Sequence, residues 1–75
     1  MSDTILMKPA DLLRRLNRLA TKRGWSIEVK EGGRHTKLTL NGLSTVIPRH
    51  PVDLKTGLHR AILKQLGITP ADLEE

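Results

Sequence analysis

The dipeptide Asn41-Gly42 restricts the possible folds of this chain more than any other feature of the sequence. It lies between residues 36–40 and 43–47, where apolar and polar side chains alternate as they do in β-strands. Asn-Gly is typical of a two-residue hairpin turn, because both central positions of that turn require a positive φ. A two-residue turn also sets the register, so that Leu40 faces Leu43 and every later residue has a defined partner.

This register divides the hairpin side chains between two faces of a sheet. The face expected to be buried carries two threonines together with Leu38, Leu40, Leu43 and Ile47. The other face carries His35 and Lys37 opposite Pro48 and Val46. The pairing therefore predicts that the segment Pro48-Arg49-His50 returns beside His35. A one-residue bulge in the hairpin is the alternative, and it would exchange the two faces.

Three further segments show helix or strand patterns. Residues 25–30 alternate with period two and predict a first strand with Trp25, Ile27 and Val29 facing inward. A helix is expected from Pro9 to the stop at Gly24, because apolar residues recur at helical spacing. These residues are Leu12, Leu13, Leu16, Leu19 and Ala20.

A second helix is expected from residues 55–57 to Leu66, with Gly67 at its end. Its inner face is predicted to consist of Leu58, Ala61, Ile62, Leu63 and Leu66. His59 is interpreted as a surface residue. Thr69 followed by Pro70 and Asp72 predicts one further short helical turn.

The order helix, three strands, helix indicates an α+β fold of two layers, with both helices on one side of a three-stranded antiparallel sheet. The outer sheet face would then stay open to solvent or to a partner. The 75 residues show no internal linker, so we expect a single domain over 1–75. Residues 1–6 are expected to be a flexible tail, and residues 69–75 a short C-terminal turn or tail.

Charge is the most informative bulk property. Thirteen Lys and Arg against eight Asp and Glu give a net charge of +5, which favours a polyanionic partner such as nucleic acid. A surplus of charge that only keeps the protein soluble is the alternative. The chain has no cysteine and no apolar run of membrane-spanning length. We therefore expect a cytoplasmic protein that does not associate with a membrane.

The stretch from Gly32 to Lys37 places an imidazole among cations at the start of a strand. We hypothesise that His35 performs acid–base chemistry on a phosphodiester, since imidazole titrates close to neutral pH. The residues expected to bind RNA phosphates are Arg34, Lys37, Arg49 and His50. A solvated His35 with no catalytic role, and a His50 that is only a loop residue, remain alternatives.

Other kinds of site lack support in the sequence. The histidines and carboxylates do not form a recognised zinc spacing, so no metal is expected. The two glycines are not followed by the Gly-Lys-Ser/Thr signature of a phosphate-binding P-loop. No cofactor is predicted.

Several motifs in this chain resemble those of HicA toxins, which are small ribonucleases of bacterial toxin–antitoxin systems. Gly33-Arg34-His35 resembles the Gly-Ser-His motif of the family, and the segment from Ile47 to His50 resembles the end of its third strand. Residues 54–68 resemble its second helix, and the similarity covers residues 7–68 in all. Two departures are Arg34 in place of serine and Leu58-His59 where Thr-Leu is common.

The resemblance implies the fold of a double-stranded RNA-binding domain. It also implies a type II toxin that cleaves mRNA without a metal, with His35 in the place of the essential histidine. A HicB-like antitoxin that covers His35 is implied as the partner. Two other functions stay open from the residues alone. One is a non-catalytic RNA-binding module of the same fold. The other is a domain whose basic surface binds an acidic protein.

Overall fold

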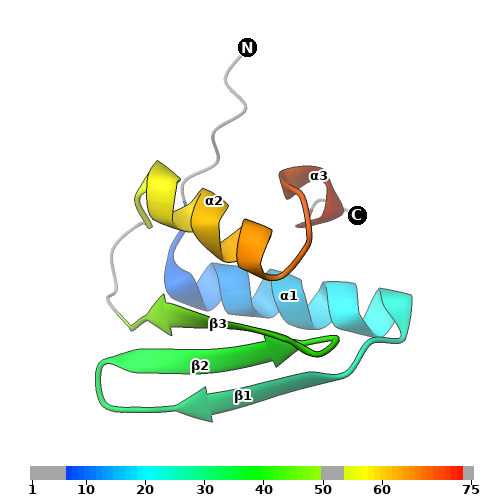
Figure 1. The fold of residues 1–75 in the computed structure, drawn as a ribbon, viewed down its shortest axis with the longest axis horizontal. Coiled ribbons are helices and arrows are strands. Elements are labelled where there is room, and N and C mark those ends of the chain that lie inside the picture. The colour runs from blue at the N-terminus through cyan, green and yellow to red at the C-terminus, as the bar shows by residue number, and fades with distance from the viewer. Residues whose placement is uncertain (1–6, 50–53, 74–75) are drawn as a thin grey trace.

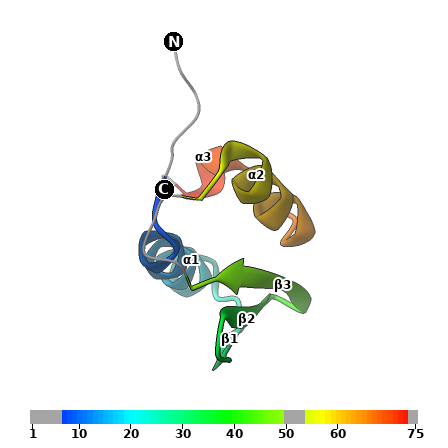
Figure 2. The ribbon, with the colours of Figure 1, turned by 90° about the vertical axis from the view of Figure 1, so that its left-hand side faces the viewer.

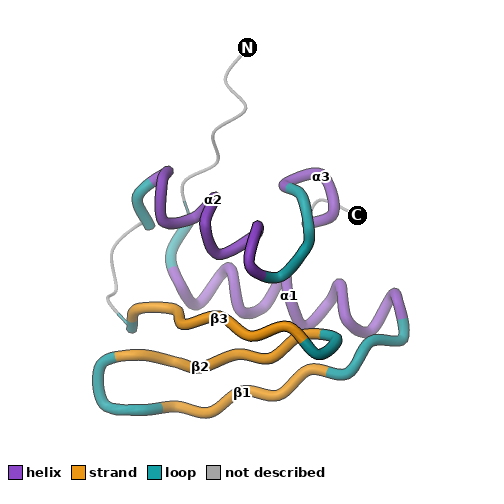
Figure 3. The backbone as a smooth tube through the Cα atoms, in the orientation of Figure 1, coloured by secondary structure: helices purple, strands orange, loops and turns teal. Residues whose placement is uncertain are grey.

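The computed structural model describes residues 7–49 and 54–73, and it confirms an α+β fold of helix, three strands and helix (Figures 1 and 3). The elements in chain order are α1 (Pro9–Arg23), β1 (Ile27–Glu31), β2 (His35–Leu40), β3 (Leu43–Pro48), α2 (Thr56–Gln65) and α3 (Pro70–Leu73). The expected tail over residues 1–6 lies outside the described residues, as do residues 74–75 of the expected C-terminal segment. No helix in the described part of the chain has the length and apolar character needed to cross a membrane.

The sheet is antiparallel with the order β1-β2-β3, and its second hairpin has the predicted register. Asn41 and Gly42 both have positive φ, at 51° and 86°, as a two-residue turn of this kind requires. Leu40 pairs with Leu43, and at the other end of the hairpin His35 pairs with Pro48. The prediction that Pro48 and Arg49 return beside His35 is therefore confirmed, whereas His50 lies outside the described residues.

The β1–β2 connection is also a two-residue hairpin loop, formed by Gly33 and Arg34. The N–H of Gly32 donates a 2.8 Å hydrogen bond to the carbonyl of His35, and this bond closes the loop. Strand β1 begins at Ile27, two residues later than predicted, because Trp25 follows α1 directly and its backbone caps that helix. The N–H of Trp25 donates a 2.9 Å hydrogen bond to the carbonyl of Ala20. Together with Gly24, whose φ is 69°, this bond forms the C-terminal cap of α1.

Helices α1 and α2 lie on the same side of the sheet and leave the opposite face uncovered (Figure 2). The core between the layers is aliphatic, since its largest fully buried side chains are Leu12, Leu16, Leu19, Leu38, Leu40, Ile47 and Ile62. The predicted stripe of α1 is thus confirmed, with Leu13 only partly buried. In β2 burial alternates strictly from His35 to Leu38, so one face is core and the other meets solvent.

The prediction that Val29 and Leu43 face the core is wrong. Val29 is 39% exposed because β1 is an edge strand that the helices do not fully cover. Leu43 is 45% exposed because it lies at the hairpin tip, where it contacts the α2–α3 connection at Gly67 on one side only. Trp25 and Ile27 are partly buried against the core, and the Arg23 guanidinium lies 5.3 Å from the centre of the Trp25 ring.

The predicted inner face of α2 is also partly wrong. Leu58 and Ala61 are exposed, whereas His59 is buried with 6% of its surface exposed. The buried stripe is His59, Ile62, Leu63 and Leu66, which has the spacing expected of one helical face. The face of α2 that meets the core is therefore shifted relative to the prediction, so that His59 is buried in place of Leu58.

The predicted C-terminal turn is confirmed as α3. Thr69 and Asp72 cap it reciprocally, because Asp72 accepts from the Thr69 N–H at 2.8 Å and its own N–H donates to the Thr69 hydroxyl at 3.3 Å. Arg23 at the end of α1 binds the same carboxylate at 2.9 Å. The Thr69 N–H bond, with a further contribution from Arg23, lowers the pKa of Asp72. These contacts hold the buried Leu73 against α1.

Candidate functional site

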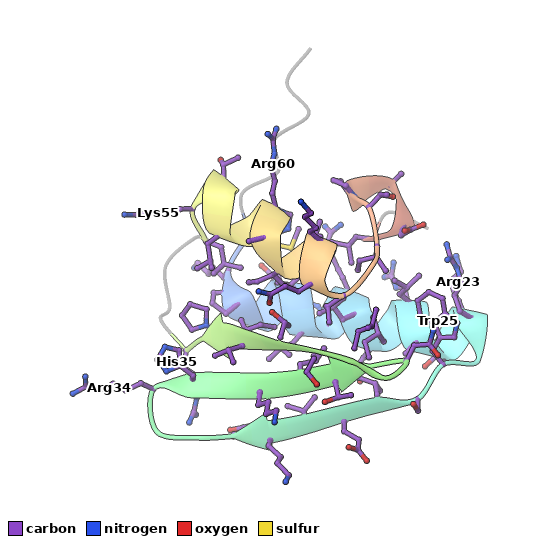
Figure 4. All side chains as sticks on the ribbon, viewed as in Figure 1. Arg23, Trp25, Arg34, His35, Lys55 and Arg60 are labelled. Carbon is purple, nitrogen blue, oxygen red and sulfur yellow. The ribbon has the colours of Figure 1, made fainter. Side chains whose placement is uncertain are left out.

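His35 is the first residue of β2 and lies on the sheet face that the helices leave uncovered. Its side chain is exposed, next to its cross-strand partner Pro48. Figure 4 shows it at the end of the sheet where the β1–β2 loop turns. An imidazole in this position is accessible to a large substrate such as a nucleic acid strand.

The backbone around His35 is held by hydrogen bonds on both sides. Its carbonyl accepts the N–H of Gly32, and the preceding carbonyl of Arg34 accepts the N–H of Arg49 at 3.0 Å. A Cβ added at Gly32 would lie 3.1 Å from the His35 carbonyl oxygen, which is tighter than ordinary van der Waals contact. Gly32 is thus needed for close approach of two backbone segments, and its φ is not positive.

Arg49 holds the loop that precedes His35. Its guanidinium donates a 2.6 Å hydrogen bond to the carbonyl of Gly32 and lies 3.4 Å from the carboxylate of Glu31. Its own N–H bonds to Arg34, so main chain and side chain both fasten β3 to the loop. We refer to Arg49, Glu31 and Gly32 as the loop clamp. The predicted phosphate-binding role of Arg49 stays a prediction, since this guanidinium is already engaged within the protein.

The remaining predicted cations lie on either side of His35. Arg34 is exposed in the loop and extends away from the body of the molecule (Figure 4). Lys37 is exposed two residues after His35 on the same strand and faces the same side. His50 follows Arg49 but lies outside the described residues. The fold therefore brings His35, Arg34, Lys37 and Arg49 to one end of the sheet.

A second basic surface lies on α1. Arg14, Arg15 and Arg18 line a shallow pocket together with Leu73 of α3. Arg14 is paired with Asp11 one turn earlier, and both side chains are largely exposed. Three guanidinium groups on one helical face suit contact with a phosphate backbone.

A groove of about 390 Å³ opens between the start of α1 and the end of the sheet. Its walls include the apolar side chains of Pro9, Leu13 and Pro48, and the Glu31–Arg49 pair lies on its rim. The groove is thus next to the loop clamp.

His59 is a titratable residue that the sequence predicts to be on the surface. In the structure it is buried. It faces the core from α2, and its Nε2 atom is buried with no hydrogen-bond partner in the described residues. Burial lowers the pKa of this imidazole. The i, i+3, i+4 spacing of His59 with Ile62 and Leu63 is the sequence signal that could have revealed its burial. Within residues 7–49 and 54–73, no group of three His, Asp or Glu side chains could hold a metal ion.

Comparisons with known proteins place the chain in a family. A family model described as the HicA toxin of bacterial toxin–antitoxin systems matches residues 13–68, which is more than half of the chain. The chain is similar to the "Probable mRNA interferase HicA" of Escherichia coli O157:H7, with 48% identity over 44 residues that cover 57% of this chain and 76% of that protein. The "Probable mRNA interferase toxin HicA" of Escherichia coli K12 matches to the same extent. The "Probable mRNA interferase HicA 1" of Photorhabdus laumondii is 44% identical over 43 residues, covering 56% and 75%.

Proposed function

The chain belongs to the HicA toxin family, and we propose that it is an endoribonuclease that cleaves mRNA with the imidazole of His35 as its acid–base group. One observation carries the proposal. His35 is exposed on the uncovered sheet face, and hydrogen bonds from Gly32 and Arg49 fix the backbone on both sides of it. The relatives named as mRNA interferases supply the substrate class.

RNA carries its own nucleophile, the 2′-hydroxyl, so the protein needs to position the strand and move protons. His35 removes the proton of the 2′-hydroxyl as the O2′–P bond forms. The P–O5′ bond then breaks, and the departing oxygen takes a proton from water to become a 5′-hydroxyl, while the proton held by His35 returns to the solvent. The products are a 2′,3′-cyclic phosphate and a 5′-hydroxyl end. A positioned general base contributes roughly 10²- to 10⁴-fold to the rate.

The cations around His35 have two tasks in this mechanism. Arg34 and Lys37 are exposed on either side of the imidazole and bind the phosphates that flank the cleaved bond. Arg49 and His50 are further candidates for this role. The arginines on α1 give the strand a second point of attachment, because RNA binding through phosphates gains from several cations. No step in this scheme requires a metal ion.

A toxin of a toxin–antitoxin system implies an antitoxin, and we propose a HicB-like protein that covers His35. An acidic surface on that protein would complement a chain of net charge +5. We also propose that the chain works as a single domain in the cytoplasm, where its mRNA substrate is translated.

The test compares wild-type protein with His35→Ala and His35→Gln on an end-labelled, structureless RNA in the presence of a chelator. We expect wild type alone to cleave and to leave cyclic-phosphate ends, while all three proteins bind the RNA with similar affinity. Cleavage by His35→Ala, or fragments with 5′-phosphate ends, would contradict the proposal. Binding by all three proteins without any cleavage would favour a non-catalytic RNA-binding module.

A further inference from the structure

Strand β3 forms an edge of the sheet, and part of its backbone has no partner there. Because Asn41 and Gly42 form a two-residue turn, Leu43, Thr45 and Ile47 direct their N–H and C=O groups toward β2. The bond from the Arg49 N–H to the Arg34 carbonyl continues this alternation. Ser44 and Val46 therefore direct their backbone groups outward, and no backbone hydrogen bond reaches them from the described part of the chain.

A groove of about 290 Å³ runs along this edge, between β3 and α2. Apolar side chains on both walls are exposed to solvent, with Val46 at 51% and Leu58 at 40%. Ala61 is a further exposed apolar residue of the α2 wall. A 2.5 Å hydrogen bond between Thr45 and Gln65 joins the two walls and keeps the groove in shape. An exposed edge with apolar side chains is a surface that proteins normally keep covered.

The charge around the groove indicates what kind of partner fits it. Lys37 lines the groove, and none of its lining residues is acidic. Helix α2 contains no acidic residue at all, and Lys55 projects just before it at the end of the molecule where His35 lies (Figure 4). A complementary segment would be extended, apolar toward Val46 and Leu58, and acidic at its flanks.

The groove leads to the candidate active site. Lys37 and His35 lie on the same face of β2, and β3 ends at Pro48, the cross-strand partner of His35. A segment that follows β3 from Ser44 to Pro48 covers about 14 Å at the usual rise of a strand. Its far end then reaches Pro48, the cross-strand neighbour of His35.

We propose that the groove between the free edge of β3 and α2 is the docking site of the antitoxin, which adds an acidic, extended segment to β3 and thereby covers His35. The inhibitory consequence rests on the function proposed above, whereas the docking itself does not. The partner pairs with the outward backbone groups of Ser44 and Val46, and its apolar side chains bury Val46 and Leu58.

Leu58→Glu and Val29→Glu form a matched pair of variants for the test. Both residues are exposed to nearly the same degree, at 40% and 39%, but Val29 lies on β1 at the opposite edge of the sheet. Leu58 is in the first turn of α2, where an acidic side chain is favourable and none is present. Thermal unfolding of both variants confirms that each is folded before binding is measured.

The affinity of each purified variant for the cognate antitoxin is measured by calorimetry, and RNA cleavage is measured with and without antitoxin. We expect Leu58→Glu to bind at least tenfold more weakly and to cleave RNA normally in the presence of antitoxin that silences wild type. Val29→Glu should behave as wild type. If wild type does not cleave RNA but Leu58→Glu still loses affinity, the docking site stands and only the proposed function fails.

Hydrogen exchange of the Ser44 and Val46 amides in the wild-type complex tests the strand pairing directly. Both amides should exchange fast in the free toxin and at least tenfold more slowly in the complex. Unchanged exchange at these two amides, or unchanged affinity of Leu58→Glu, overturns the proposal. The last experiment is sedimentation of the free toxin. A wild-type dimer that dissociates in the Leu58→Glu variant would show that the groove binds a second copy of the chain and would overturn the proposal.

Discussion

The guanidinium of Arg49 reaches from the end of β3 to the backbone carbonyl of Gly32, 2.6 Å away, in the loop that leads into His35. The bond thus joins the end of β3 to the β1–β2 loop. Strand β2, which carries His35, lies between β1 and β3 in the sheet. Glu31 lies against the same guanidinium at 3.4 Å and helps to fix its direction. We therefore expect Arg49 to act on the position of His35 as well as on the charge of the site.

Arg49→Lys should lower kcat by roughly tenfold or more while changing KM little, because a lysine cannot make both contacts of the loop clamp and small misplacements of a catalytic group are costly. Steady-state kinetics on a short RNA at several salt concentrations measures this. Arg34→Ala is the contrast, since its exposed side chain should affect KM and the salt dependence instead. An Arg49→Lys variant that raises KM alone would show that Arg49 acts mainly as a phosphate ligand.

Gly32→Ala should reduce cleavage several-fold, because its Cβ would lie 3.1 Å from the His35 carbonyl oxygen and the backbone would have to shift. Gly33→Ala is the control, since a Cβ there meets nothing within 4 Å and the backbone φ is not in the positive range. Initial rates of RNA cleavage measure the difference. Equal rates for the two variants would mean that the exact path of this loop does not matter for catalysis.

His59 should make the fold sensitive to mild acid. Its folded-state pKa is lowered by burial, so the unfolded chain takes up a proton at a higher pH than the folded protein does. The free energy of unfolding therefore keeps its full value above about pH 6.5 and falls as the pH drops below that value. The loss is about 1.4 kcal/mol for each unit by which the pKa of His59 differs between the unfolded and the folded state. Urea denaturation between pH 8 and pH 5 measures this dependence. In His59→Met the dependence over that range should be weaker, and an unchanged slope would contradict the assignment.

Asp72 should contribute a separate loss of stability at lower pH. Its pKa is lowered by the Thr69 N–H and by Arg23, so its contribution is present above about pH 4 and is lost as the pH falls further. Asp72→Asn should remove this part of the acid sensitivity and lower the melting temperature slightly at neutral pH. Ala71→Asn is the control, because that side chain is exposed in the same short helix. Identical acid profiles for wild type and Asp72→Asn would refute the prediction.

The sheet register could be predicted because one local motif determines it. Asn41-Gly42 favours a two-residue turn, and every pairing from Leu40 with Leu43 to His35 with Pro48 follows from that turn. The stripe of α1 was equally clear, since its leucines stand at helical spacing and its other side is basic. Local sequence thus located the candidate base and its neighbours on one end of a sheet.

The orientation of α2 could not be predicted in the same way. Two stripes overlap in this helix, one through Leu58 and Ala61 and one through His59 and Leu63, and both include Ile62. Apolar composition favours the first, but the docking of the helix on β3 selects the second. This choice depends on long-range packing, which periodicity within one element does not contain.

The loop clamp was missed for a related reason. The sequence predicts Arg49 as a phosphate ligand, whereas in the structure its partners Glu31 and Gly32 belong to a strand and loop far earlier in the chain. The β1–β2 and β2–β3 registers together bring them close, and the β1–β2 turn carries no Asn-Gly signal that would predict it. The exposure of Val29 likewise depends on how far the helices extend over an edge strand.

The order of the elements along the chain has a consequence for how the protein is made. Both hairpins join strands that are adjacent in sequence, so the sheet closes short loops and can form as soon as β3 is complete. Contacts such as that between the Leu54 N–H and the Met7 carbonyl, which bring the start of α2 beside the start of α1, wait for residues synthesised later. During synthesis, β2 with His35 and both neighbouring strands are therefore complete before the α2 residues that line the groove proposed to receive the inhibitor are made.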